Sequence, residues 1–472
     1  MDDLIKLTAR EAVKLLKNGE VSPLDLIDAA VERIEEVEKD VNAVPTLCVE
    51  RAREQARTLM SRKEDDLPPY YLYGLPIVVK DLDDVEGVRT TYGSPIYIDH
   101  VPDRSDYMVE TLERNGAIVI GKSNTPEFGA GANTFNEVFG VTRNPWNTAM
   151  TCGGSSGGSA VALATGEAWL ATGSDLGGSL RIPASYCSVV GFRPSPGRVA
   201  SGPKVLAFDT LAVHGPMARN IPDLALMLDA MTGAHPGDPL SFHRPGSSYI
   251  DAIEHPIKPR KIAFSLDLNI APVDPEVREV FNKTVASWKG LGIDMEESCP
   301  DLRDAEEVFQ VLRAMLFAAH FSPLLKSHRD LLKQDIIWNI EKGLELTPDE
   351  IGKAERARSE LYQRTAKFFE DYDLLICPTV IAPPFDVNIR YLTEVDGVEF
   401  DSYIGWLVLT FAITLTACPA ISVPCGFTSS GLPIGLQIIG PPRREDWVLS
   451  GAAIFEKAHN IDSLLPINPR TG

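Results

Sequence analysis

The sequence predicts a single large α/β domain over residues 1–472, with a sheet covered by helices on both faces. Three observations support this prediction: short apolar runs occur throughout the chain, helix start signals lie between them, and no repeat or low-complexity segment marks a domain boundary. Strands buried on both faces appear as continuous apolar runs, because helices cover both sides of such a sheet. The first part of the domain, 1–65, is expected to be a helical segment.

Capping residues predict the N-terminal helices. Thr8 and Glu11 have the spacing of a capping box, in which each side chain bonds to the other residue's backbone N–H. Pro23 is suited to the first turn of a second helix, where its missing N–H costs nothing. The expected elements of this region are, in order, a helix over 8–18, a helix from Ser22, a helix over 49–60, a charged linker over 63–69 and a strand over 77–79 that ends at Lys80.

The later elements are apolar strands that alternate with helices. Each expected strand is a short apolar run bounded by glycine, proline or polar residues. The runs 420–423 and 434–439 flank a Thr-Ser-Ser-Gly turn and predict a β-hairpin. The other expected elements are a helix after Asp106, a strand over 117–120, a helix over 160–164, a strand over 169–172, a helix over 347–369 and a strand over 374–377.

Composition excludes some classes of partner. The formal net charge of −21 argues against direct binding of nucleic acid, which is itself a polyanion. Seven scattered cysteines with no Cys-x-x-Cys pair predict reduced thiols in a cytoplasmic protein. The eight histidines lack any spacing typical of metal ligands, so no metal is expected. Prolines and glycines interrupt the charge-free stretch 402–442, which we therefore expect to form buried core rather than a membrane helix.

Three short motif matches are weak. Residues 116–123 fit the phosphate-loop pattern G-x-x-x-x-G-K-S, but the variable positions are an apolar run that predicts a strand inside the motif. Residues 201–204 fit S-x-x-K, although Gly202 and Pro203 disfavour the helix that this motif needs. Residues 153–157 fit G-x-S-x-G, but a polar loop rather than a strand precedes them.

Two glycine–serine turns, 153–158 and 174–181, are the stronger candidates for chemistry. Two glycines before Ser179 let the backbone turn sharply and leave N–H groups uncovered, as an oxyanion hole requires. Asp175 and Arg181 flank this turn and can pair to hold it. A nucleophilic serine needs a base; Lys80, at the end of an apolar strand, can serve if it is desolvated, although such a lysine is usually a solvated strand end.

The stretch 153–184, "GGSSGGSAVALATGEAWLATGSDLGGSLRIPA", resembles the signature of the amidase signature family, hydrolases with a Ser–Ser–Lys triad. The resemblance extends to "GLPIVVKD" (74–81), "GKSNTPEFG" (121–129), "GPMARNIPDL" (215–224) and "GLPIGLQIIG" (431–440). It therefore covers most of the chain. The least recognisable part, about 240–400, is expected to be a variable, helix-rich region.

The resemblance implies a role for each matching residue. Ser179 becomes the nucleophile, Ser155 the bridging serine and Lys80 the base, with a cis peptide bond between Gly154 and Ser155. It also implies a large mixed sheet and a reaction that needs no cofactor. The oxyanion hole is expected from the backbone of Leu176, Gly177, Gly178 and Ser179, and the supporting residues are Ser156, Ser174, Asp175 and Arg181.

Two functions remain open within this resemblance and one outside it. The stretches 151–158 and 410–427 look more like those of free-standing amidases than like those of the glutaminase subunit of a tRNA-dependent amidotransferase. A nucleotide-dependent enzyme that uses residues 116–123 is the third reading. The expected partner is a small-molecule amide, with no direct nucleic acid and no membrane; a homodimer stays open.

Overall fold

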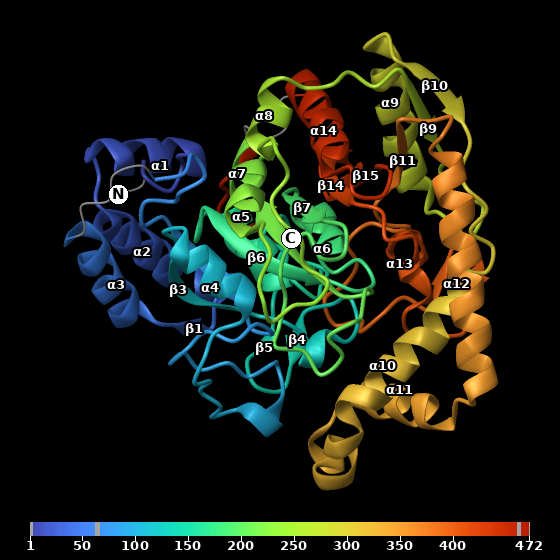
Figure 1. Cartoon of the computed structure of the whole chain (residues 1–472), viewed down its shortest axis with the longest axis horizontal. Helices are drawn as coiled ribbons and strands as arrows, with labels where there is room; N and C mark the ends of the chain where they lie inside the picture. The colour runs from blue at the N-terminus through green and yellow to red at the C-terminus, as the bar shows by residue number, and fades with distance from the viewer. Residues whose placement is uncertain (1–2, 62–66, 460–463, 472) are drawn as a thin grey trace.

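The computed structural model describes residues 3–61, 67–459 and 464–471, and its centre is a twisted sheet of 11 strands with helices on both sides (Figure 1). The spatial order is β1-β3-β2-β6-β8-β7-β14-β15-β11-β9-β10. Their bounds are β1 Thr46–Leu47, β2 Pro76–Lys80, β3 Ile118–Ser123, β6 Leu170–Asp175, β7 Val190–Arg193, β8 Val213–Ala218, β9 Lys261–Phe264, β10 Asp294–Glu297, β11 Leu374–Pro378, β14 Ala420–Phe427 and β15 Pro433–Ile439.

The sheet is mixed, as expected. Strand β2 is parallel to both β3 and β6, and β9 is parallel to both β10 and β11, whereas the other neighbours are antiparallel. The predicted hairpin is present as β14 and β15, with a register shift between Pro424 and Gly426. Two small sheets lie outside the large one; they pair β4 Phe135–Asn136 with β5 Gly140–Val141, and β12 Glu394–Val395 with β13 Val398–Glu399.

Helices surround this sheet. The described residues contain 14 α-helices: α1 Ala9–Asn18, α2 Pro23–Val41, α3 Val49–Ser61, α4 Tyr107–Arg114, α5 Gly157–Thr165, α6 Arg181–Cys187, α7 Ile221–Met231, α8 Tyr249–Glu254, α9 Pro275–Gly290, α10 Ala305–Ser327, α11 Gln334–Glu345, α12 Pro348–Phe368, α13 Val408–Leu415 and α14 Glu445–His459. Short 3-10 helices occur at Pro95–Tyr97, Glu127–Gly129, Arg329–Leu331 and Gly405–Leu407. Helices α1–α3 lie at one end of the molecule and α10–α12 at the other (Figure 1).

The predicted N-terminal helices follow their caps. Thr8 Oγ1 accepts a hydrogen bond from the backbone N–H of Glu11 at 3.1 Å, and Glu11 Oε2 accepts one from the backbone N–H of Thr8 at 2.8 Å. The capping box is therefore confirmed. Helix α2 begins at Pro23, as its sequence indicated. Residues 63–66 of the predicted charged linker lie outside the described residues.

Alternate residues of the strands point into two cores. In β11, Leu374 and Ile376 pack into the core that contains Val448 of α14, whereas Leu375 and Cys377 pack into the core shared with α10, α12 and α13. The period of two along a strand produces this division. Helices therefore cover both faces of the sheet, which confirms the predicted fold class.

The charge-free stretch 402–442 forms core elements. Helix α13 is buried along its whole length, and the strands β14 and β15 follow it in the sheet. Among the described residues, one helix, α10, is long and apolar enough to cross a membrane by length and composition. Its residues Val308, Phe309 and Leu312 belong to the core that α13 also shares.

Candidate active site

Lys80 is the last residue of β2, and its side chain is completely buried. Its amine contacts three hydroxyl groups: Nζ lies 2.7 Å from Ser155 Oγ, 2.8 Å from Ser156 Oγ and 3.0 Å from Ser174 Oγ. A neutral amine has two N–H groups and one lone pair, so three hydroxyl neighbours can satisfy it. The two glycine–serine turns of the sequence thus meet at one lysine.

Burial lowers the pKa of Lys80 to about 7, because the ammonium form loses its hydration; the carboxylates of Asp83 and Asp175 oppose this shift. The neighbouring Asp81 does not contact the amine. It accepts hydrogen bonds from the N–H and hydroxyl of Thr91, and its Oδ1 lies 3.5 Å from Lys122 Nζ. In the described residues no carboxylate lies within 4.0 Å of Lys80 Nζ, so nothing at contact distance holds the proton there.

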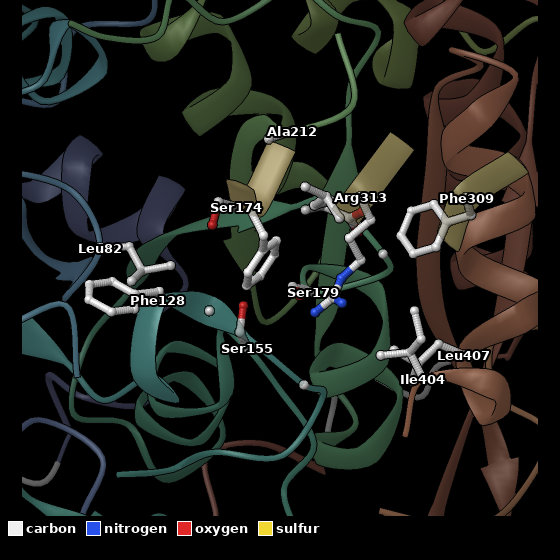
Figure 2. Close-up of a pocket in the computed structure, with 16 residues that line it drawn as sticks. Leu82, Phe128, Ser155, Ser174, Ser179, Ala212, Phe309, Arg313, Ile404 and Leu407 are labelled. Carbon is white, nitrogen blue, oxygen red and sulfur yellow. The ribbon is translucent and has the colours of Figure 1, made fainter. Parts of the chain in front are cut away.

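Ser155 and Ser179 face a common cavity (Figure 2). The peptide bond between Gly154 and Ser155 is cis, and the chain then enters α5 at Gly157. Ser179 precedes α6, and its carbonyl accepts the N–H of Ser156 at 3.2 Å, which ties the two turns together. The cavity has a volume of about 160 Å³ and its wall is made by Leu82, Phe128, Gly129, Gly131, Ser155, Ser174, Asp175, Leu176, Gly177, Ser179, Ala212, Phe309, Arg313, Phe317, Ile404 and Leu407.

The backbone of the second turn presents N–H groups beside Ser179. The Gly178 N–H donates to Asp175 Oδ1 at 3.0 Å, and the Leu180 N–H donates to Asp175 Oδ2 at 3.2 Å. The N–H groups of Leu176, Gly177 and Ser179 have no acceptor among the described residues. Four N–H groups were expected to form an oxyanion hole. The one of Gly178 already donates to Asp175, which leaves those of Leu176, Gly177 and Ser179 as candidates.

Asp175 holds this turn through two buried arginines. The expected pair is present: Arg181 donates from Nε to Oδ2 at 3.0 Å and from Nη2 to Oδ1 at 2.9 Å. Arg193 lies 3.2 Å from Oδ1 and also donates to the Asp175 carbonyl. Burial alone would raise the pKa of Asp175, but the two guanidinium groups hold it at about 2. The turn is thus fixed by a permanently ionised carboxylate.

Several residues of this network were missed in the sequence. Arg193 ends β7, Thr410 lies in α13 and Gln437 lies in β15. Thr410 Oγ1 donates to the Gly177 carbonyl at 2.6 Å, and Arg181 Nη1 donates to the Thr410 carbonyl at 2.9 Å and to Gln437 Oε1 at 2.5 Å. No local pattern indicates these contacts, because they join segments more than 200 residues apart.

The weak motifs behave as expected from their sequence. Strand β3 covers 118–123, so most of the phosphate-loop match lies in a strand of the sheet. Lys122 is buried, and its amine donates to the Asp83 carbonyl at 2.6 Å and to Thr90 Oγ1 at 2.7 Å. No free loop of N–H groups is left there to hold phosphates. Ser201 lies in a non-helical segment with its N–H donated to Asp238, so Lys204 is not one helical turn below it.

One cluster of metal-ligating residue types was not visible in the histidine spacing. Asp83, Asp106 and His214 have ligand atoms that all lie within 4.8 Å of one another. His214 Nε2 lies 3.5 Å from Asp83 Oδ1, and Nδ1 lies 3.6 Å from Asp106 Oδ1. Burial raises the pKa of Asp106 to about 6, against the attraction of His214. His214 also pairs across the sheet with Ser174, which places this cluster beside the site of Lys80.

Known proteins share this architecture. The Amidase family matches residues 25–449. An acylamidase of Rhodococcus erythropolis is 33% identical over 455 residues, which are 95% of this chain and 95% of the relative. A glutamyl-tRNA(Gln) amidotransferase subunit of Geobacillus kaustophilus (strain HTA426) is 36% identical over 482 residues, 96% of this chain and 97% of the relative.

A solved structure agrees with these matches. The crystal structure of a bacterial aryl acylamidase, described as belonging to the amidase signature enzymes, superposes with a TM-score of 0.90. It is 27% identical in sequence and covers 98% of this chain and 99% of that chain. From the family match over most of its length and from these relatives, the chain belongs to the amidase signature family.

Proposed function

We propose that the protein hydrolyses carboxylic amides through an acyl-enzyme on Ser179, with Ser155 as bridging serine and Lys80 as base. The observation that carries this proposal is the buried amine of Lys80, whose nearest neighbours are hydroxyl groups and not carboxylates. Burial lowers its pKa to about 7, so the neutral amine, which can accept a proton, is available near neutral pH. A solvated lysine would be almost wholly protonated there.

The reaction begins with proton transfer along this chain of groups. The lone pair of Lys80 Nζ takes the proton of Ser155, and Ser155 takes the proton of Ser179 as the Ser179 Oγ attacks the amide carbon. The carbonyl π electrons move to oxygen, which becomes an oxyanion. The free N–H groups of Leu176, Gly177 and Ser179 are the donors that we assign to it.

The second half of the reaction returns the proton. The C–N bond breaks, and the departing nitrogen receives a proton through Ser155, so an amine leaves and an ester on Ser179 remains. Water then attacks this ester, gives a proton to Lys80 through the same relay, and releases the carboxylic acid as Ser179 is reprotonated. These steps use only groups of the chain, the substrate and water. Asp175 and Arg181 fix the turn, while Ser156 and Ser174 position the lysine amine.

A free-standing amidase is favoured over a glutaminase subunit by the cavity wall. Glutamine carries an α-ammonium group that would need an anionic partner. Among the described residues, Asp175 is the one carboxylate that lines the cavity, and two arginines and two N–H groups already occupy it. The relatives include amidotransferase subunits, so glutamine hydrolysis within a complex is the second candidate.

The test is activity of the purified chain on a panel of simple amides and on glutamine. We expect hydrolysis of simple amides without any partner protein or tRNA. A fluorophosphonate should label Ser179 in the wild type; Ser179→Ala should give no adduct, and Ser155→Ala a slow one. An adduct mapped to Ser155 or Ser156 would reverse the assignment, and glutamine turnover restricted to a reconstituted complex would favour the second candidate.

A further inference from the structure

The cavity wall combines an apolar surface with one unusual cation. Much of the wall is apolar, including Phe128, Phe309, Phe317 and Leu407. Arg313, from the middle of α10, lines the same cavity and is only 4% exposed. Figure 2 shows its guanidinium group directed into the space beside Ser179. A fixed positive charge therefore faces the same space as the nucleophile.

The protein partners of Arg313 are all neutral. Its Nη1 donates to Asn339 Oδ1 and its Nη2 donates to the hydroxyl of Tyr403. The rings of Phe317 and Tyr403 lie 4.5 and 5.1 Å from its guanidinium carbon. Among the residues that the structure describes, none places a carboxylate within 4.0 Å of this group. Arginine has five N–H donors, and these two hydrogen bonds use two of them.

The other two arginines near the nucleophile share one counter-ion. Arg181 and Arg193 are fully buried, and both lie within 3.2 Å of the Asp175 carboxylate. A buried charge without a counter-ion is costly, and arginine cannot lose its proton to avoid the cost. Arg313 therefore differs from its neighbours in that no counter-ion for it lies among the described residues. The cavity is where a counter-ion can enter.

We infer that Arg313 binds a carboxylate group of the substrate, so that the preferred amides are acidic. The inference rests on the proposed amide hydrolysis and names its substrate class. The planar fork of arginine matches a carboxylate with two parallel hydrogen bonds. A cavity of about 150 Å³ accommodates a benzene molecule, so the volume of about 160 Å³ suits a short chain or one ring between the amide and the carboxylate.

The experiment compares matched amides that differ in one carboxylate. The monoamide of glutaric acid is paired with pentanamide, which places the carboxylate on the acyl side; N-pentanoylglycine is paired with N-ethylpentanamide, which places it on the amine side. In the wild type we expect a kcat/KM ratio of at least about 10 in favour of the acid in one pair, the lower end for a hydrogen bond between charged groups. The pair that shows the preference identifies the side.

The variants separate recognition from folding. Arg313→Met should bring the ratio to about 1 and change kcat/KM of the neutral amide by less than about threefold. Arg313→Lys should keep part of the preference, because it retains the charge without the fork. The matched control is Arg358→Met: Arg358 is half-buried and donates to the Leu415 carbonyl and to Thr210 Oγ1, but it does not line the cavity. It should leave the ratio unchanged.

Two results overturn the inference while leaving amide hydrolysis intact: a wild-type ratio near 1 for both pairs, or an equal loss on acidic and neutral amides in Arg313→Met. If no amide is hydrolysed, the proposed function fails, and titration calorimetry with glutarate still tests Arg313. Binding to the wild type that is lost in Arg313→Met supports the inference. Absence of binding to the wild type, or equal binding to both proteins, contradicts it.

Discussion

Two buried lysines in adjacent parallel strands have different partners. Lys80 ends β2 and Lys122 lies in β3, one residue apart in the register of the pair, and both side chains are completely buried. Lys122 Nζ lies 3.5 Å from the Asp81 carboxylate and is also bonded to the Asp83 carbonyl and Thr90. Lys80 Nζ contacts three serine hydroxyls instead. The same residue type at the same depth thus lies in two electrostatic environments.

This difference shows that the partners, and not burial alone, decide what a lysine can do. Burial lowers the pKa of both amines, but the charges of Asp81, Asp83 and Asp84 favour the ammonium form of Lys122. Asp81 follows Lys80 in the sequence, but its carboxylate pairs with Lys122 and does not contact the Lys80 amine. Lys122 is therefore held in a buried pair with Asp81, and Lys80 is the proposed base.

The largest expected effect is on activity. Replacing Lys80 with methionine removes the proton acceptor and should lower kcat on a simple amide by about 10²–10⁴-fold, the usual contribution of a positioned general base. The unfolding midpoint should change little, because an apolar chain of similar length fills a buried site. Steady-state kinetics and denaturant unfolding measure the two effects. A variant of near-normal activity would remove Lys80 from the mechanism.

The next effect is on stability. Lys122→Met leaves the buried Asp81 carboxylate without its cation, which costs about 3–5 kcal/mol when one partner of a buried pair is removed. Urea unfolding of the variant should show this loss. The double variant Lys122→Met/Asp81→Asn should recover much of it, because no buried charge remains unpaired. A stable but inactive single variant would mean that Lys122, too, takes part in the chemistry.

The smallest expected effect is that of the Asp83 carboxylate on the pKa of Lys80. Asp83 stabilises the ammonium form of Lys80, so Asp83→Asn should lower the pKa of the amine and move the basic limb of activity to lower pH by about 1 unit or less. The pH profile of kcat/KM on a simple amide measures the shift. A limb that moves to higher pH would contradict the sign of this electrostatic coupling.

Local signals in the sequence predicted much of the fold. Capping residues such as Thr8 and apolar runs such as 77–79 are short-range features, and the helices and strands they predicted are present. Strand β8 was missed because Pro216 is unusual inside a central strand. The neighbouring strand β7 pairs with Met217 and Ala218 of β8. Pro216 lies beyond the end of this pairing, so its missing N–H costs no hydrogen bond to β7.

The candidate site was predictable where the chain has a long motif. The glycine–serine turns and Lys80 carry the family resemblance, which named them. The side chains of Arg193, Arg313 and His214 carry no such motif. Each is defined by a group that only the fold brings to it: the Asp175 carboxylate, the cavity and the Asp83 carboxylate, respectively. The same limit applied to Lys80, whose proposed role as base depends on the separate pairing of Asp81 and Lys122.

The most direct test of the role of Lys80 is the rate of Ser179 acylation by a fluorophosphonate between pH 5 and 10, in the wild type and in Lys80→Met. Since only the neutral amine accepts a proton, the wild-type rate should rise through a pKa of about 7 and then level off. The variant should be at least about 100-fold slower on the plateau and should lack this limb. A near-normal rate in Lys80→Met with the same limb would contradict the account and leave Ser179 without an identified base.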